Sequence, residues 1–203
     1  MKESLRFWMD EAVRAAKLLF DRNKVTGSSG NISFRYDDSI YISGSGTCFG
    51  WLKQSDFAVI DSEGHQLSEV QPSKEYPLHK IIYDARPDIC AVIHTHSFYS
   101  TLISCIADEQ SRDVFKEITP YLKMKVGAVG MIPQAEPGSR ELFDMLYKRV
   151  HCSDGYLLAN HGPVTVGKDI RSAFYGMEEM EETAKLHYYL HAIKGEKKRW
   201  QNY

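Results

Sequence analysis

Hydrophobic positions along the first part of the chain predict one helix followed by short strands. Apolar residues recur at helical spacing from Glu3 to Phe20, which is typical of an amphipathic helix with one apolar stripe. The small residues from Thr26 to Gly30 follow the end of this helix. Three runs with β-type patterning come next, at residues 31–35, 39–43 and 57–61. This part of the chain is therefore expected to form antiparallel strands joined by turns.

The rest of the chain alternates between helical and extended patterns. After Pro72-Ser73-Lys74-Glu75, apolar residues with a period of 3.6 predict a helix that Pro87 stops, with Ser73 as its N-terminal cap. Apolar strands that turn polar at their ends are expected at residues 91–97 and 155–159. Further helices are predicted at residues 97–106, 139–150 and 170 to about 193. Since no repeat or linker interrupts the pattern, one domain is expected to span residues 1–203.

Composition narrows the classes of partner and the compartment. The 203 residues suit one compact domain, and the formal charge of -2, from 25 basic and 27 acidic residues, gives no electrostatic footprint for nucleic acid. The four cysteines lie far apart and form no CxxC pair, which favours reduced thiols in a cytoplasmic protein. The first residues do not have the pattern of a signal peptide, and no apolar run approaches the ~20 residues that cross a bilayer. No nucleic acid and no membrane is therefore expected as a partner.

Three histidines form a candidate metal site. His94 and His96 stand two residues apart in an extended segment, where side chains of alternate residues share a face. His161 follows a second apolar strand and can complete a set of three nitrogen ligands, leaving a position open for water or substrate. Alone, an HxH pair fits surface or packing histidines equally well. Because both segments are strand ends, the pattern favours an active site.

Glu75 is the candidate carboxylate beside this metal site. A carboxylate near a metal can bind the ion when substrate is absent and move a proton when substrate is present. The same residue also fits an ordinary helix start, since an early glutamate favourably meets the helix dipole. His79 lies four residues further along the predicted helix and could point toward Glu75.

Two glycine-rich segments, at residues 27–31 and 43–46, are candidate anion loops. Backbone N–H groups in such loops can cradle a phosphate. Neither segment has the pattern of a nucleotide-binding loop, and each alone also fits a plain turn.

The chain resembles the class II aldolase/adducin superfamily along nearly its whole length. The matching motifs, in order, are GSSGNISFR, ISGSG, PSKE with the downstream His79, AVIHTHS and ANHGPVTVG. The resemblance implies a three-layer α/β/α fold with a central, mainly antiparallel sheet. It also implies a homotetramer with one Zn²⁺ per subunit, in a site that can take Mn²⁺, Co²⁺ or Fe²⁺ instead.

The resemblance also assigns roles to individual residues. It implies that His94, His96 and His161 bind the metal and that Glu75 is both a metal neighbour and the acid/base. The substrate phosphate is expected against Asn31, Ser45, Gly46 and Ser73, with residues 27–30 shaping the same loop.

Among the branches of the superfamily, the chain is most similar to 3-oxo-tetronate 4-phosphate decarboxylases. The shared features are the lysine before Glu75, the stretch at residues 118–127, Pro137-Gly138, and ANHGPV followed by EEMEETAKL. Fuculose-phosphate aldolases usually carry a second serine where this chain has Lys74, and adducin-like members lack the metal histidines. An aldolase and a non-catalytic adducin-like module therefore stay open as alternatives.

Decarboxylation and aldol cleavage have a common chemistry. Both break a carbon–carbon bond next to a ketone and leave an enediolate, whose charge a divalent metal can stabilise. For a phosphorylated 3-oxo acid the products are CO₂ and dihydroxyacetone phosphate, with Glu75 transferring the proton and Lys74 holding the carboxylate or phosphate. Most of the carboxylates of Glu178, Glu179, Glu181 and Glu182 are expected on a solvated or intersubunit face, and Tyr188, Tyr189 and Trp200 could contribute to subunit contacts.

Overall fold

One seven-stranded sheet organises the chain. The computed structural model describes residues 4–116 and 118–200, with side chains as far as residue 193. The strands, in chain order, are β1 (Asn31–Tyr36), β2 (Ser39–Ser43), β3 (Phe57–Asp61), β4 (Ala91–His94), β5 (Val129–Ile132), β6 (Gly155–Leu158) and β7 (Gly162–Gly167). Their order across the sheet is β3-β2-β1-β4-β7-β6-β5, and every neighbouring pair except β5 and β6 is antiparallel. The predicted, mainly antiparallel sheet is confirmed.

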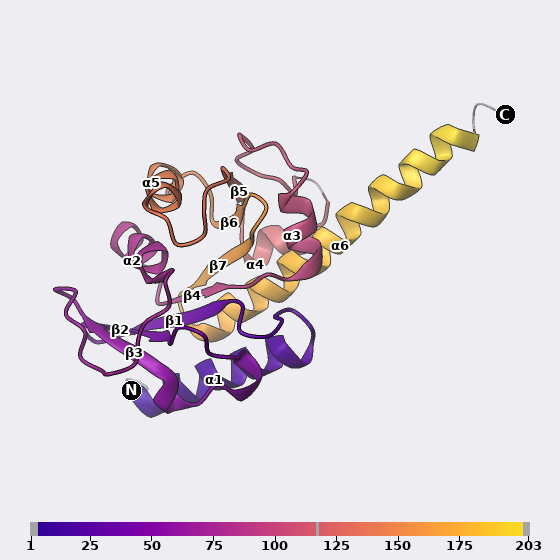
Figure 1. Cartoon of the computed structure of the whole chain (residues 1–203). Coiled ribbons are helices and arrows are strands. Elements are labelled where there is room, and N and C mark those ends of the chain that lie inside the picture. The colour runs from indigo at the N-terminus through magenta and orange to yellow at the C-terminus, as the bar shows by residue number, and fades with distance from the viewer. Residues whose placement is uncertain (1–3, 117, 201–203) are drawn as a thin grey trace.

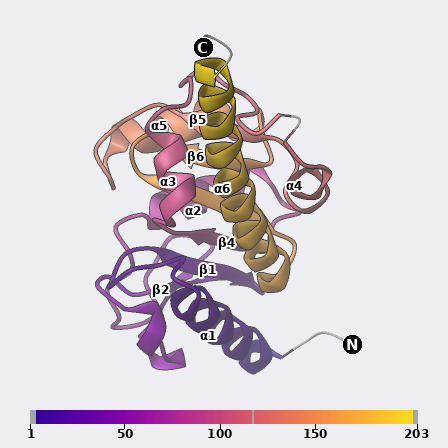
Figure 2. The ribbon, with the colours of Figure 1, turned by 90° about the vertical axis from the view of Figure 1, so that its right-hand side faces the viewer.

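Helices cover both faces of this sheet. They are α1 (Leu5–Asp21), α2 (Tyr76–Ala85), α3 (Phe98–Ser104), α4 (Pro120–Lys125), α5 (Arg140–Arg149) and α6 (Ile170–Trp200), with short 3₁₀ turns η1 (Phe49–Trp51) and η2 (Gln54–Asp56). Helices α2 and α5 pack on one face, whereas α1, α3, α4 and α6 pack on the other (Figure 1). Figure 2 looks onto the side with α1, α3 and α6. The three-layer α/β/α architecture is therefore as predicted.

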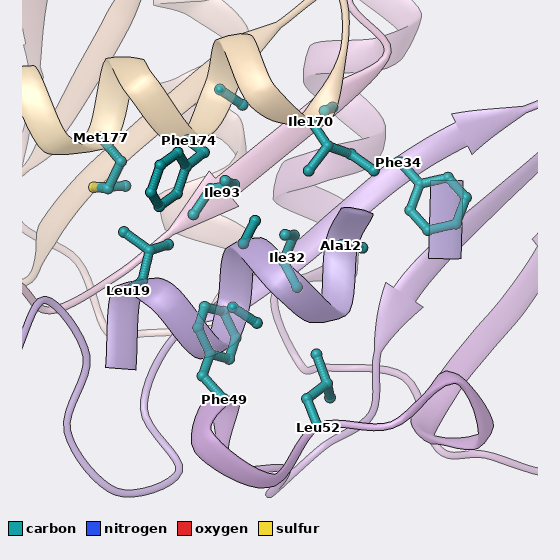
Figure 3. Packing of buried hydrophobic residues seen from close by; sticks show 14 of the residues in the cluster. Ala12, Leu19, Ile32, Phe34, Phe49, Leu52, Ile93, Ile170, Phe174 and Met177 are labelled. Carbon is teal, nitrogen blue, oxygen red and sulfur yellow. The ribbon is translucent and has the colours of Figure 1, made fainter. Parts of the chain in front are cut away.

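The face toward α1 and α6 is apolar. Ile32 and Phe34 of β1 and Ile93 of β4 contact a cluster that includes Leu19 of α1 and Met177 of α6 (Figure 3). These side chains are inaccessible to solvent, and burying each contributes roughly 1.5–3 kcal/mol. This cluster fixes β1 and β4, the two strands that lead to the candidate site.

The elements differ from the sequence-based prediction at several points. Strands β5 and β7 and helix α4 were not predicted, and the strand expected at residues 91–97 ends at His94. Strand β7 begins Gly162-Pro163, a pair that is typical of a turn, yet it lies between β4 and β6. The backbone of α6 continues past the predicted end near residue 193 and projects beyond the sheet (Figure 1). The side chain of Trp200 lies outside the described residues.

No helix among the described residues has the length and apolar character that a membrane span requires.

Candidate metal centre

The first histidine, His94, is the last residue of β4, the central strand of the sheet. His94 pairs with Asn31 of β1 on one side and with Val164 of β7 on the other. Its side chain is on the face toward α2, because Ile93 faces α1 and side chains alternate along a strand. The imidazole is fully buried, and its Nδ1 donates a hydrogen bond to the carbonyl of Pro163 at 2.9 Å.

The other two histidines lie on segments that follow β4 and β6. His96 stands two residues beyond the end of β4 and is exposed, so the predicted histidine pair straddles the strand end. His161 lies in the three-residue turn between β6 and β7, where Leu158 pairs with Gly162. Asn160 adopts a left-handed conformation in this turn, with φ of 56°, which asparagine tolerates well.

The three imidazoles converge through their Nε2 atoms. The Nε2 atom of His94 lies 3.1 Å from Nε2 of His96 and 3.2 Å from Nε2 of His161. Three ligands around a tetrahedral zinc ion, each with a Zn–N distance of about 2.05 Å, would stand about 3.3 Å apart. The structure therefore brings the three predicted histidines into a spacing that suits a small divalent cation.

The hydrogen bond of the His94 ring leaves a lone pair on its Nε2, the atom that faces the other two imidazoles. Since a carbonyl oxygen only accepts, Nδ1 of His94 carries the proton and Nε2 carries a free lone pair. Burial lowers the pKa of His94, and burial together with the charge of His94 lowers the pKa of His161 to about 4. Both rings are therefore neutral at pH 7, which is the form that binds metal.

Glu75 completes the cluster from the start of α2. Its Oε2 lies 3.4 Å from Nε2 of His94, and its Oε1 lies 3.5 Å from Nε2 of His161. Asn31 donates its amide hydrogen to Oε2 at 2.8 Å, whereas the buried Oε1 accepts no hydrogen bond from the described residues. Burial alone would raise the pKa of Glu75, but His94, His161 and Asn31 together hold this pKa below its usual value.

The donor set fits a metal ion. A buried carboxylate next to three uncharged imidazoles is a concentration of electron-pair donors, and such a group is costly to bury without a cation. A divalent ion would balance the charge and engage the free Oε1. His94, His96 and His161 form the one His/Cys/Asp/Glu group with metal-binding spacing in the described part of the chain, and Glu75 lies within 3.5 Å of two of them. These four residues could therefore hold the ion.

Two of the residues predicted to hold the phosphate, Asn31 and Ser73, are hydrogen-bonded to Glu75. The loop with Ser45 and Gly46 lies beside Ser73, because Ser45 N–H donates to Gln71 at 2.8 Å and Ser73 N–H donates to Ser43 at 3.3 Å. Ser45 and Gly46 are exposed, and Gly46 adopts a φ of 75° that glycine favours. Asn31 is buried instead, and its amide already binds Glu75.

The start of α2 differs from the prediction. The cap position belongs to Glu75, and Ser73 does not cap the helix. Its Oγ accepts a 3.3 Å hydrogen bond from the backbone N–H of Glu75, two residues later. A local turn of this kind competes with capping and places Glu75 at the mouth of the helix. Lys74 is exposed next to it, and its backbone lies close to Gly138.

A family model for the class II aldolase and adducin N-terminal domain matches residues 10–188. The chain belongs to this family. Members of the class II aldolase family generally depend on a divalent metal, which agrees with the histidine cluster. The resemblance inferred from the motifs is thus confirmed.

Relatives of this class II aldolase family member carry two kinds of name. A 3-oxo-tetronate 4-phosphate decarboxylase from Pectobacterium atrosepticum is 40% identical over 177 residues, which are 87% of this chain and 81% of that protein. An L-fuculose phosphate aldolase from Methanocaldococcus jannaschii is 38% identical over 174 residues, which are 86% of this chain and 92% of that protein. Both names denote lyases.

A solved structure supports the same fold. The crystal structure of YgbL from Escherichia coli matches with a TM-score of 0.85 and 36% sequence identity. The match covers 90% of this chain and 88% of that one. The class II aldolase fold therefore extends over nearly the whole chain.

Two buried polar residues near the cluster were not assigned from the sequence. Most of the four glutamates of α6 were expected on a solvated or intersubunit face, and Glu181 is an exception, since the residue is 3% exposed. Its carboxylate accepts hydrogen bonds from the backbone of Tyr99 and from the backbone and hydroxyl of Ser100, at 2.8–3.0 Å. It thereby anchors the start of α3, directly after His96. His79 is also fully buried, and it contacts Asn31 and Ser33.

Proposed function

We propose that this protein is a metal-dependent carbon–carbon lyase that decarboxylates 3-oxo-tetronate 4-phosphate to dihydroxyacetone phosphate and CO₂. The observation that carries the proposal is the buried carboxylate of Glu75 beside three converging Nε2 atoms, with one oxygen held by Asn31 and the other left without a hydrogen bond. The name of the relative from Pectobacterium atrosepticum supports this substrate.

In this proposal His94, His96 and His161 hold the metal, and Glu75 lies beside it as a further ligand when substrate is absent. The ion is Zn²⁺, one per subunit, and Mn²⁺, Co²⁺ or Fe²⁺ are the alternatives that imidazole ligands accept. When bound, such an ion supplies positive charge against the negative charge that develops on the substrate oxygens.

Glu75 moves the proton. In its ionised form the carboxylate accepts the proton of the substrate hydroxyl at C2, the bond between C1 and C2 breaks, and C1 leaves as CO₂. The electron pair stays on the remaining three-carbon enediolate. Glu75 returns its proton to C2, and one proton from solvent completes dihydroxyacetone phosphate. The lowered pKa of Glu75 suits this order, because the group must start as a base.

Polar groups at the rim bind the two ends of the substrate. Ser45 and Ser73 offer their hydroxyls and Gly46 its backbone N–H for the phosphate, and the amide of Asn31 is a further donor. Lys74 is exposed beside Glu75 and supplies a positive charge for the departing carboxylate or for the phosphate.

A second candidate function is aldol cleavage of a deoxy-sugar phosphate, which the relative from Methanocaldococcus jannaschii supports at nearly the same identity. The deciding experiment offers zinc-loaded protein 3-oxo-tetronate 4-phosphate and L-fuculose 1-phosphate separately. Mass spectrometry then follows the release of CO₂ or of an aldehyde. Release of CO₂ from the first substrate supports the decarboxylase, and aldehyde release alone would replace it with the aldolase. An inert protein that purifies without metal would favour a non-catalytic module.

Glu75→Gln tests the proton transfer separately. Glutamine keeps the shape and one oxygen but cannot take a proton, so turnover should fall at least about 100-fold while bound metal stays within a factor of two. Elemental analysis and kcat on the accepted substrate measure the two quantities. Full turnover in this variant would remove Glu75 from the proton-transfer role.

We also propose that the chain works as a cytoplasmic homotetramer and forms one domain over residues 1–203. Exposed apolar side chains of α6, including Leu186, Tyr188, Tyr189 and Leu190, are suited to subunit contacts. Light scattering on the zinc-loaded protein measures the mass, and a monomer at micromolar concentration would contradict the tetramer.

A further inference from the structure

Five polar side chains from α2 and β1 interlock behind the metal centre. Glu75, His79 and Tyr83 are spaced four residues apart, so they lie along one side of α2 and its N-terminus. Asn31 and Ser33 are two residues apart and share the face of β1 that is directed toward α2. The two series alternate, so each side chain of β1 lies between two side chains from the helix.

Hydrogen bonds join all five groups in one line. Tyr83 Oη lies 2.7 Å from Ser33 Oγ, and Ser33 Oγ lies 2.7 Å from Nδ1 of His79. Nε2 of His79 lies 2.5 Å from Oδ1 of Asn31, whose Nδ2 donates to Oε2 of Glu75 at 2.8 Å. The line begins at Tyr83, near the end of α2, and finishes on the carboxylate of the candidate site.

The chemistry of the groups fixes the direction of every proton in the line. A carboxylate only accepts, so Asn31 presents its NH₂ to Glu75 and its carbonyl oxygen to His79. His79 must then donate from Nε2. As a neutral ring it accepts at Nδ1, and Ser33 is the donor there. Tyr83 in turn donates to Ser33, so each hydrogen points toward Glu75.

Burial keeps both titratable members of the line neutral. His79 and Ser33 are inaccessible to solvent, and Tyr83 is 2% exposed. Burial lowers the pKa of His79 to about 3, and burial also raises the pKa of Tyr83. Neither side chain changes its charge near neutral pH, so the direction of the line is stable.

The line distinguishes the two oxygens of Glu75. Oε2 is held by Asn31 at the end of the line, whereas Oε1 is buried and takes no hydrogen bond from the described residues. Aligned hydrogen bonds polarise one another and restrict rotation of the groups they join. Four buried polar residues in this place are costly unless such an arrangement needs them, since apolar side chains would fill the same space without partners.

We propose that His79 is a positioning residue: through Asn31 it fixes the Glu75 carboxylate so that Oε1 is the oxygen that transfers the proton. This inference rests on the proposed function for its kinetic effect. The protonation of His79 at Nε2 follows from the hydrogen bonds alone and can be tested without turnover.

Two variants of the same residue separate positioning from packing. In His79→Gln the amide nitrogen reaches the place of Nε2 and keeps the donor to Asn31, whereas in His79→Asn the shorter amide reaches only the place of Nδ1 and loses it. We expect His79→Gln to keep kcat within about 5-fold and His79→Asn to lower it about 10–100-fold, each with KM within about 3-fold, as for lost supporting hydrogen bonds at other sites. Bound zinc should stay equal in both.

An equal kcat in the two amide variants would overturn the proposal, because packing alone does not distinguish them. Where one variant fails to fold, Ser33→Ala provides the second test. It removes the donor to Nδ1 of His79 and should lower kcat about 3–10-fold. Wild-type kcat in folded Ser33→Ala contradicts the proposal.

Nitrogen-15 NMR of histidine-labelled, zinc-loaded protein gives the readout that does not depend on turnover. The signals absent from His79→Gln assign His79, and we expect a proton on Nε2 and a bare Nδ1 from pH 8 to pH 5. A proton on Nδ1 would overturn the inferred line. Wild-type protein that turns over neither candidate substrate would instead contradict the proposed function, and the NMR result would still decide the state of His79.

Discussion

The two faces of strand β1 carry different chemistry within four consecutive residues. Ile32 and Phe34 point into the apolar cluster under α1 and α6, whereas Asn31 and Ser33 point toward α2 and join hydrogen bonds that end at Glu75. All four side chains are buried. Burial therefore serves stability on one face and the orientation of polar groups on the other.

This difference leads to opposite expectations for substitutions on the two faces. On the apolar face, free energy scales with the area removed from water, and neighbours tolerate other residues of similar volume. On the polar face, each group depends on the partner before it, and a lost partner leaves an unsatisfied buried atom. Changes on the first face should alter stability, and changes on the second should alter the site.

The largest expected effect is on the polar face, at His94→Ala. Removing the central imidazole takes one metal ligand and leaves Glu75 without its nearest histidine. We expect bound zinc to fall below a tenth of the wild-type amount, and activity at least about 1,000-fold. Elemental analysis and kcat measure the two losses. Undiminished zinc in a folded variant would contradict the assignment of His94 as a ligand.

The next effect is on the apolar face, at Phe34→Ala. The ring of Phe34 stacks on Tyr41 with centroids 5.0 Å apart and also contacts Trp8 and Phe57. Its removal should lower the free energy of unfolding by about 3–5 kcal/mol. Urea unfolding measures this change, while zinc content at low temperature should stay near the wild-type value. A loss of zinc without a loss of stability would mean that the two faces are not separable in this way.

Sequence patterns predicted the apolar face better than the polar one. Alternation of apolar residues located β1 to β3 within one residue, and the helical period located α5 within one residue and α1 within two. Alternation and helical periodicity arise when one face of an element is buried and the other is not. Strand β7 is buried on both faces and shows no such pattern. It lies between β4 and β6, and its residues include glycine at both ends and Pro163, whose carbonyl binds Nδ1 of His94.

The metal ligands of the candidate site could be predicted from the sequence, whereas the hydrogen bonds behind them could not. His94, His96 and His161 were expected together from their spacing and from the family motifs, and the structure brings their Nε2 atoms together. The line through His79 was not predicted, because it depends on the register of α2 against β1. The buried Glu181 could not be found either, since its partners are backbone N–H groups of α3.

A smaller effect concerns the pH dependence of stability and the buried His79. Its pKa in the folded protein is lowered to about 3, below the usual value of 6.5, so the unfolded chain binds this proton first as the pH falls. Stability is therefore complete above pH 6.5 and decreases from there toward pH 3, at roughly 1 kcal/mol per pH unit for one proton. Urea midpoints of metal-free protein at pH 7, 6 and 5 measure the slope. The slope in His79→Gln should be shallower by about one proton, and an unchanged slope would contradict a neutral His79.

The smallest effect lies on the surface of the apolar side, where Arg171 of α6 contacts Glu11 of α1. The hydrogen bond and charge of Arg171 hold the pKa of Glu11 below its usual value, although partial burial opposes this. A lowered carboxyl pKa adds stability above the unfolded pKa of about 4.3, and this stability is lost as the pH falls through the folded value. Because Arg171 is more than half exposed, Arg171→Met should cost less than about 1 kcal/mol at pH 7. Urea unfolding at pH 7 and pH 3.5 should show the difference from wild type shrinking at the lower pH, whereas a difference that grows on acidification would mean that the pair does not act through the charge of Glu11.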